Sequence, residues 1–263
     1  MAALRSLILA GMLATFVTPG FAADVGVPVY KAPPPVEEGW TFQATGYAWA
    51  SGVTGDMGVR YLPPVHTNVT AWDALKELDG AFMGSFLAKK GDWMFMTDLI
   101  WAKISDHATV GANGSQVDFT QTQITASGLV SYKLPLGLPE NVELSATVGF
   151  RYQRLKAELD FSPGLYPITI SREGTEGWID PTVGFSLHYA VNDKWFVNVI
   201  ADVGGFGVGS KFTTQGFASV GYMWTPSIST ALGYRVIYTD YENDGFVYDI
   251  TQHGVFTSIA YHF

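Results

Sequence analysis

Charged and amide side chains recur at similar positions along five successive segments of alternating apolar and polar residues. These residues are Arg151, Asp180, Asp202, Gln215 and Arg235. Each is on the polar side of its segment, nine to eleven residues from the nearest short turn. In extended chains the side chains alternate between two faces, so we expect all five on one face at nearly one height. Asp98, on an earlier segment, would join them from the opposite side.

Such a layer has two physical interpretations. Around an open channel, a ring of charged side chains acts as a filter or gate. In a narrow barrel, arginines and carboxylates instead pair and hydrogen-bond in a sealed network. We favour the sealed network, because barrels of about eight strands are filled by side chains whereas open porins have about 16 to 18 strands. A narrow passive pore for small solutes is the alternative.

The segments that position these residues have a period of two and are separated by turn residues, as strands are. We predict strands at 40–50, 80–90, 92–104, 116–134, 141–157, 178–190, 194–206, 211–224, 228–241 and 247–263. Every second connection is short, and the two longest, 51–79 and 158–177, fall only between these short ones. Membrane barrels have this arrangement of turns and loops. The sequence therefore predicts an all-β fold, a closed antiparallel transmembrane barrel of ten strands, with eight strands as the fallback.

The two faces of the predicted strands differ in composition. On the strand at 178–190, Ile179, Val183 and Phe185 alternate with Asp180 and Thr182. A soluble ligand-binding barrel such as a lipocalin also alternates, but its apolar face lines the pocket. Here the second face is rich in Gly, Ser, Thr and charges, which suits a polar lumen and an apolar surface against lipid.

Composition excludes several functions. The chain has 48% hydrophobic, 14% aromatic and 15% charged residues, and its net charge is −9. An acidic chain does not suit nucleic-acid backbone, which needs a basic surface. The chain has no cysteine, which excludes disulfides and thiolate metal sites. We expect no cofactor and no metal.

The N-terminal residues predict export. Residues 1–22 contain one charge, Arg5, an apolar stretch from Leu7 to Val17, and small residues at Gly20 and Ala22. This pattern is typical of a cleaved signal peptide. Residues 23–39, with three consecutive prolines, predict an extended periplasmic leader before a barrel at 40–263.

Several motifs resemble small outer-membrane barrels of alphaproteobacteria, of the OmpA or opacity type. They are Ala23-Asp24 with the Lys31–Pro35 leader, Trp178–Pro181, Asp202–Phe206 and Leu232–Arg235. The ending Tyr261-x-Phe263 is similar to the signal that the outer-membrane assembly machinery reads. The resemblance covers roughly 40–263 and implies a transmembrane barrel without a periplasmic domain. It also implies the cell outer membrane of a Gram-negative bacterium.

These observations together predict a structural or surface-interaction role and no enzyme activity. The expected partners are outer-membrane lipid, lipopolysaccharide and, through the last strand, the assembly machinery. We predict no nucleic-acid partner, and the oligomeric state stays open.

An outer-membrane enzyme is the third hypothesis. A rim protease of the omptin type uses Asp/His pairs, and His66, His107, Asp106, Asp240 and Asp244 fall in or beside predicted outer loops. They lack the Asp-x-His or Asp-x-Asp spacing on a strand end, so general-base geometry is not indicated.

Two further features belong to the outer surface. A lipid A-modifying site needs a serine in register with the outward-facing His253, where the sequence has Val255. In the loop at 51–79, Trp72, Leu75 and Leu78 have helical spacing and predict a short amphipathic helix, lying on the rim or plugging the mouth.

Overall fold

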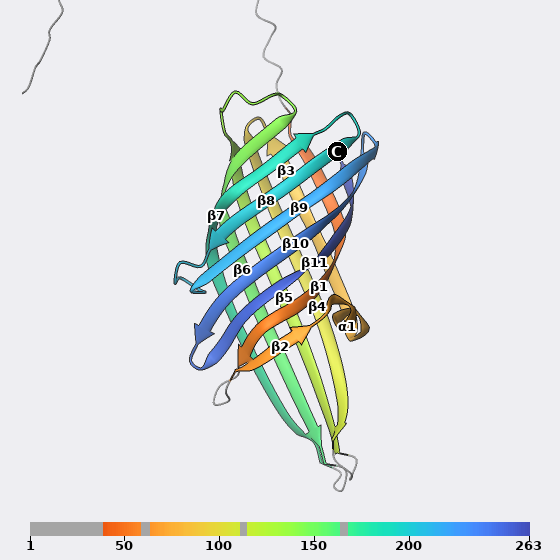
Figure 1. Cartoon of the computed structure of the whole chain (residues 1–263), viewed down its shortest axis with the longest axis vertical. Coiled ribbons are helices and arrows are strands. Elements are labelled where there is room, and N and C mark those ends of the chain that lie inside the picture. Colours follow the sequence, from red (N-terminus) through yellow and green to blue (C-terminus); the bar gives the residue numbers. More distant parts are fainter. Residues whose placement is uncertain (1–38, 59–63, 111–114, 164–167) are drawn as a thin grey trace, which may run out of the picture. The chain divides into compact units, whose positions relative to one another are not determined.

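The computed structural model describes residues 39–58, 64–110, 115–163 and 168–263 (Figure 1). The expected signal peptide (1–22) and all but the last residue of the expected leader (23–39) lie outside the described residues. The strands are β1 (Thr41–Gly58), β2 (Val65–Val69), β3 (Leu78–Lys90), β4 (Trp93–Val110), β5 (Ser115–Lys133), β6 (Val142–Ser162), β7 (Ile170–Ala190), β8 (Trp195–Gly204), β9 (Phe212–Thr225), β10 (Ile228–Asn243) and β11 (Phe246–His262), and the helix is α1 (Ala71–Lys76).

Ten strands form a closed antiparallel barrel, which confirms the predicted fold and strand count. Strands β1 and β3 to β11 follow one another around the ring, and β11 pairs back to β1. Closure includes the last residue, because the Phe42 N–H donates to the Phe263 carbonyl at 2.8 Å and the Phe263 N–H donates to the Phe42 carbonyl at 3.0 Å. β2 stays outside the ring and pairs with Val53–Met57, near the C-terminal end of β1.

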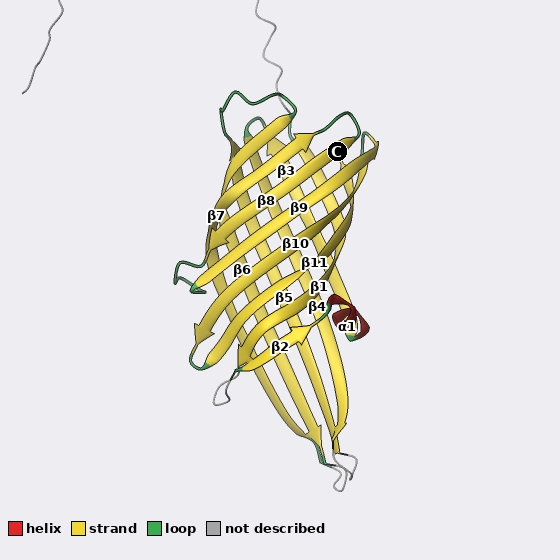
Figure 2. Ribbon diagram, viewed as in Figure 1, coloured by secondary structure: helices red, strands yellow, loops and turns green. Residues whose placement is uncertain are grey.

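The two ends of the barrel differ in their connections (Figure 2). At the end that we call the turn end, the connections are 91–92, 134–141, 191–194 and 226–227, and the C-terminus lies there too. At the opposite loop end lie β2 and α1, within the connection 59–77 between β1 and β3, which is the longest connection at either end. Outer-membrane barrels have short periplasmic turns and longer external loops, so we assign the turn end to the periplasm.

The alternation of the sequence separates the two faces of the barrel wall as predicted. Ile179, Val183 and Phe185 are exposed on the outer surface, whereas Asp180 and Thr182 of the same strand are buried in the lumen. The exposed aromatic and aliphatic side chains form the face that meets lipid.

Four strands extend beyond the rest of the barrel at the loop end (Figure 1). The β3–β4 ladder stops at the Leu78–Ile104 pair, and β7 pairs with β8 only from Thr182 onward. Beyond that row β4 to β7 continue as a four-stranded sheet, which we call the outer sheet (105–110, 115–121, 157–162 and 170–174). These four strands have 18 to 21 residues, whereas a tilted strand needs only about 9 to 11 to cross the hydrocarbon, so they project beyond it.

The predicted short helix is present as α1 and lies outside the barrel wall rather than in its mouth. It begins after Thr70, whose hydroxyl accepts a hydrogen bond from the Asp73 N–H at 3.2 Å. The same hydroxyl donates to the Asp73 carboxylate at 2.6 Å and thereby lowers the pKa of Asp73. None of the residues of α1 is buried. No helix among the described residues is long and apolar enough to cross a membrane.

Candidate functional site: a charged layer across the lumen

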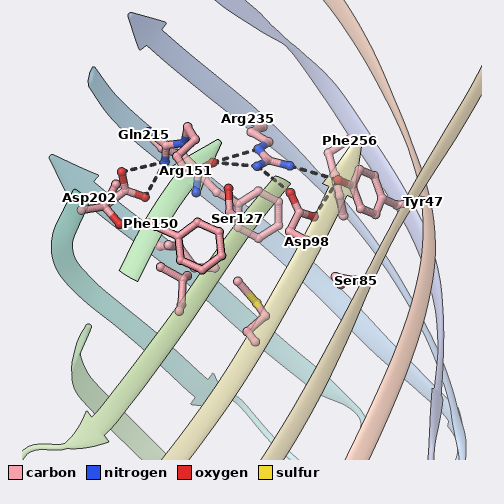
Figure 3. A pocket seen from close by; sticks show the side chains of 15 residues that line it. Tyr47, Ser85, Asp98, Ser127, Phe150, Arg151, Asp202, Gln215, Arg235 and Phe256 are labelled. Carbon is pink, nitrogen blue, oxygen red and sulfur yellow. Dashed lines mark hydrogen bonds and ion pairs between the residues drawn. The ribbon is translucent and has the colours of Figure 1, made fainter. Parts of the chain in front are cut away.

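Arg235 is the centre of the charged layer (Figure 3). It extends inward from β10, and its guanidinium donates to Asp98 Oδ1 of β4 at 2.9 Å. It also donates to Gln215 Oε1 of β9 at 2.7 and 3.1 Å and to the Tyr47 hydroxyl of β1 at 3.2 Å. The Tyr47 hydroxyl in turn donates to Asp98 Oδ2 at 2.6 Å. Arg235 thus connects its own strand, β10, to three other strands, β1, β4 and β9.

The second pair of the layer joins Arg151 of β6 to Asp202 of β8. A single guanidinium nitrogen donates to both carboxylate oxygens, at 2.7 and 2.9 Å, and both side chains are almost fully buried. Arg151 also donates to the Thr213 hydroxyl at 3.0 Å, and that hydroxyl donates to the Tyr238 carbonyl at 2.9 Å. Two arginines therefore meet two carboxylates, and the layer as a whole is neutral.

Asp180 does not join this layer, which corrects the sequence-based expectation. Although Asp180 is the ladder neighbour of Arg151, the β7–β8 register places Asp202 beside Gly184, four residues nearer the turn end than Asp180. Asp180 instead accepts the Ser210 N–H of the β8–β9 connection at 2.6 Å. Equal counts from the turns do not give equal heights, because barrel strands are tilted and staggered.

The sequence reasoning missed Tyr47 and Thr213, both of which bond to the arginines. Tyr47 lies on β1, far from the segments that were aligned by their turns. Thr213 is an ordinary strand threonine whose role depends on contacts with β6 and β10. A pattern of period two gives at most the direction of a side chain and carries no signal for its partners.

Two further layers fill the lumen on the loop side of the arginines. Gln123 and Gln252 exchange hydrogen bonds of 3.0 and 2.9 Å across the barrel. Beyond them lies a buried cluster that we call the aromatic cluster. Its members are Leu155, Trp178, Tyr241, Phe246, Tyr248 and Ile250. The Trp178 and Tyr241 rings stack with their centroids 4.0 Å apart.

A cavity of about 80 Å³ adjoins the layer, lined by Tyr47, Asp98, Arg151 and Asp202 among others. One water needs about 10 to 15 Å³ of such space, so the cavity holds only a few waters. Within the described residues, no three His, Asp or Glu side chains are placed to hold a metal ion.

The residues weighed for an enzyme site are spread over the loop end. His66 Nδ1 lies 2.9 Å from Asp56 Oδ1 on the exposed β1–β2 hairpin, a pair that the sequence spacing did not predict. Asp106 and His107 are exposed neighbours on β4. His253 faces outward, and its Nδ1 lies 2.6 Å from the Tyr234 hydroxyl.

The expected assembly signal lies on the outer surface at the turn end. Tyr261 and Phe263 are both more than half exposed, and their rings stack at 5.6 Å. Phe263 also stacks on Phe42 at 5.6 Å. Its recognition by the assembly machinery stays a prediction.

Comparisons with known proteins agree with this architecture. No protein-family model matches the chain. Over 208 residues the chain is 26% identical to the 31 kDa outer-membrane immunogenic proteins of Brucella melitensis biotype 1 and Brucella suis biovar 1, covering 73% of this chain and 83% of each relative. The crystal structure of the outer membrane protease OmpT from Escherichia coli is similar with a TM-score of 0.52 and 10% identity, over 86% of this chain and 97% of that one.

The chain is an outer-membrane β-barrel protein. It is related to the Brucella 31 kDa proteins, whereas the likeness to the protease shows the shared fold alone. The protein is therefore located in the cell outer membrane of a Gram-negative bacterium, as the sequence predicted. Its charged layer lies within the wall that spans this membrane.

Proposed function

We propose that this barrel is a structural, non-catalytic component of the outer membrane, with a closed lumen and an outer sheet available for interactions outside the cell. The observation that carries the proposal is the charged layer. Arg235 and Arg151 each bond to side chains of other strands, and together they span the lumen.

The closed lumen is inferred from the hydrogen bonds and ion pairs of the charged layer that a solute would have to break in order to pass. An ion at the layer meets two arginines already neutralised by Asp98 and Asp202, so there is no net charge to attract it. It must also pass the stacked Trp178 and Tyr241 rings. Replacing buried charge-assisted hydrogen bonds is costly, because each leaves an unpaired group in a medium of low dielectric constant.

Conductance across planar bilayers tests closure. We expect no steady conductance for the natural protein or for Ser85→Ala, a control that lines the same cavity without bonding to the arginines. The double variant Arg235→Ala with Asp98→Ala removes the centre of the layer and should open a channel. Steady conductance of the natural protein would overturn closure and favour the narrow pore. Opening only in Trp178→Ala with Tyr241→Ala would assign closure to the aromatic cluster instead.

The outer sheet supports the surface-interaction role. It carries five carboxylates against one arginine (Asp106, Asp118, Glu158, Asp160 and Glu173 against Arg172). An acidic projecting surface favours cationic partners and repels acidic ones. The Brucella relatives are named as immunogenic, which fits a surface that is displayed on those proteins.

Labelling of intact cells tests this display, and the absence of cysteine makes single labels specific. A membrane-impermeant maleimide should modify Gly174→Cys in the outer sheet and leave Glu140→Cys at the turn end unmodified until the cells are lysed. Labelling of position 140 alone in intact cells would reverse the orientation and remove the basis of the surface role.

The non-catalytic assignment is tested at the Asp56–His66 pair of the rim. The folded protein should leave unfolded basic peptides intact. Cleavage that is lost in His66→Ala and retained in His107→Ala would identify the Asp56–His66 pair as catalytic and overturn the assignment.

A further inference from the structure

The barrel wall has a seam where two neighbouring strands separate. The β1–β3 ladder runs from Thr41–Lys89 to Gly46–Gly84 and ends there. Further along β1, pairing resumes at Val53 with β2 rather than β3. Between these points the Trp49 N–H donates to the sulfur of Met83 at 3.3 Å, in place of a strand carbonyl. We call this part of the wall, residues 47–52 of β1 and 78–83 of β3, the seam.

The chain crosses the outside of the seam on its way into α1. A Cβ atom on Gly52 would lie 2.9 Å from the Val69 carbonyl oxygen and 3.2 Å from the Ala71 nitrogen. Only glycine allows the backbone to approach β1 this closely. α1 then leads to β3, so it lies over the region where the two strands diverge (Figure 1).

The barrel wall covers only part of the apolar side of α1. At 3.6 residues per turn, Ala74, Ala71, Leu75 and Trp72 occupy one continuous arc. The two alanines are half-buried, but Trp72 is 67% exposed and Leu75 is 45% exposed. The acidic and basic residues occupy the opposite arc, which leaves the two large apolar side chains beside the wall without cover from the described residues.

The exposed pair lies in the helix that leads directly into a strand with lipid-facing residues. β3 follows α1 directly, and its outward-facing Phe82 and Phe86 are 60% and 43% exposed. The Lys76 ammonium lies 5.8 Å from the Trp72 ring centroid, which places a cation beside an amphipathic ring. Tryptophan and lysine side chains together are typical of the boundary between hydrocarbon and headgroups.

We propose that α1 is an interfacial helix, with Trp72 and Leu75 inserted into the outer leaflet, that seals the seam from the lipid side. Backbone groups cannot face hydrocarbon without a partner, so a seam at membrane depth needs a cover. An amphipathic helix lying in the interface supplies one through its apolar face. The proposal is independent of the proposed function and holds whether or not the lumen conducts.

Single cysteine labels measure the depth of α1, since the chain has no cysteine of its own. An environment-sensitive fluorophore is attached at Leu75→Cys, Trp72→Cys, Asp73→Cys, Phe82→Cys or Gly174→Cys, and each variant is refolded into vesicles with brominated acyl chains. Heat-modifiable gel mobility selects the preparations that contain folded barrels. We expect labels at 72 and 75 to be quenched as strongly as the one at 82, and the label at 73 to be as weakly quenched as the one at 174.

Two results would overturn the proposal. The first is a label at 75 that is quenched no more than the label at 174, because the helix then lies in water. The second is equal quenching at 73 and 75, because the helix then has no lipid-facing side. An unlabelled check uses tryptophan emission: the loss of bromine quenching in Trp72→Phe, relative to the natural protein, should identify Trp72 as a quenched residue.

Discussion

The charged layer and the outer sheet share two strands, β4 and β6, and use charge in opposite ways. On β6, Arg151 is buried and neutralised by a two-oxygen contact with Asp202, whereas five residues on, Lys156 pairs with Glu158 and Glu173 in an exposed position. In the charged layer each arginine has a carboxylate partner, and the charges of the layer sum to zero. In the outer sheet the sum is strongly negative. The difference follows from solvent, because water stabilises an unpaired charge outside, whereas a buried charge needs an ion-pair partner or hydrogen bonds from the protein.

The largest effect expected from this contrast is the loss of one partner in the lumen. Asp202→Ala leaves Arg151 buried and unpaired, which should lower the free energy of unfolding by about 3 to 5 kcal/mol. Urea unfolding in lipid vesicles measures it. The matched exposed change, Lys156→Ala, should shift the unfolding midpoint far less, since exposed ion pairs are screened by water. Equal shifts would remove the contrast.

A smaller loss is expected from adding a methyl group where two strands approach closely. In Gly254→Ala the new Cβ would lie 1.8 Å from the Ala50 carbonyl oxygen, so the closing ladder must move. Overpacking of this kind costs about 1 to 3 kcal/mol. Gly174→Ala in the outer sheet adds the same group where no atom lies within 4 Å, and we expect no measurable change in the same unfolding experiment.

A nearly neutral result is expected when both charges of the buried pair are replaced. Arg151→Met with Asp202→Leu removes the desolvation cost together with the attraction, so stability should recover most of what Asp202→Ala loses. Vesicle unfolding of the double variant, compared with each single variant, gives the coupling energy. A double variant as unstable as Asp202→Ala would show that the layer depends on shape or on Thr213 rather than on the ion pair.

The smallest effect is expected outside the wall, at the cap of α1. The Thr70 hydroxyl stabilises the charged form of Asp73, and a lowered folded-state pKa means that this stabilisation is present above the ordinary pKa and is lost as pH falls through the lowered one. In Thr70→Ala the pKa of Asp73 should rise towards its ordinary value. NMR titration of the Asp73 carboxyl measures the change. An unchanged titration would assign the lowered pKa to Lys76 instead.

The sequence predicted the barrel because membrane and lumen impose opposite chemistry on alternate residues. Phe185 and Ile179 could only face lipid, and Asp202 and Arg235 could only face inward. The outer sheet lies beyond the closed ring, so this constraint ends there, and the predicted ends of β4, β6 and β7 fall short of the observed ones. Asp180 was misplaced for a different reason, since strand stagger is a property of the closed ring and not of any single strand.

The layer itself was only partly predictable. The inward direction of Arg151, Gln215 and Asp98 follows from the period of two. The choice of partner depends on which side chains reach across the lumen. Tyr47 bonds to Arg235 because ring closure pairs β1 with β11, the neighbour of β10, and so brings the first strand within reach of Arg235. Such contacts join residues far apart in sequence, so a local sequence pattern cannot predict them.

The two backbone hydrogen bonds between Phe42 and Phe263 are expected to form late in folding. These two residues are separated by almost the whole described chain, and contacts of such long range form slowly because their loop must close first. Until then β1 and β11 are unpaired edges, which invite pairing with other chains. Pairing of β1 with β11 is therefore a late contact: the ring stays open, and vulnerable to aggregation, until both strands have been delivered.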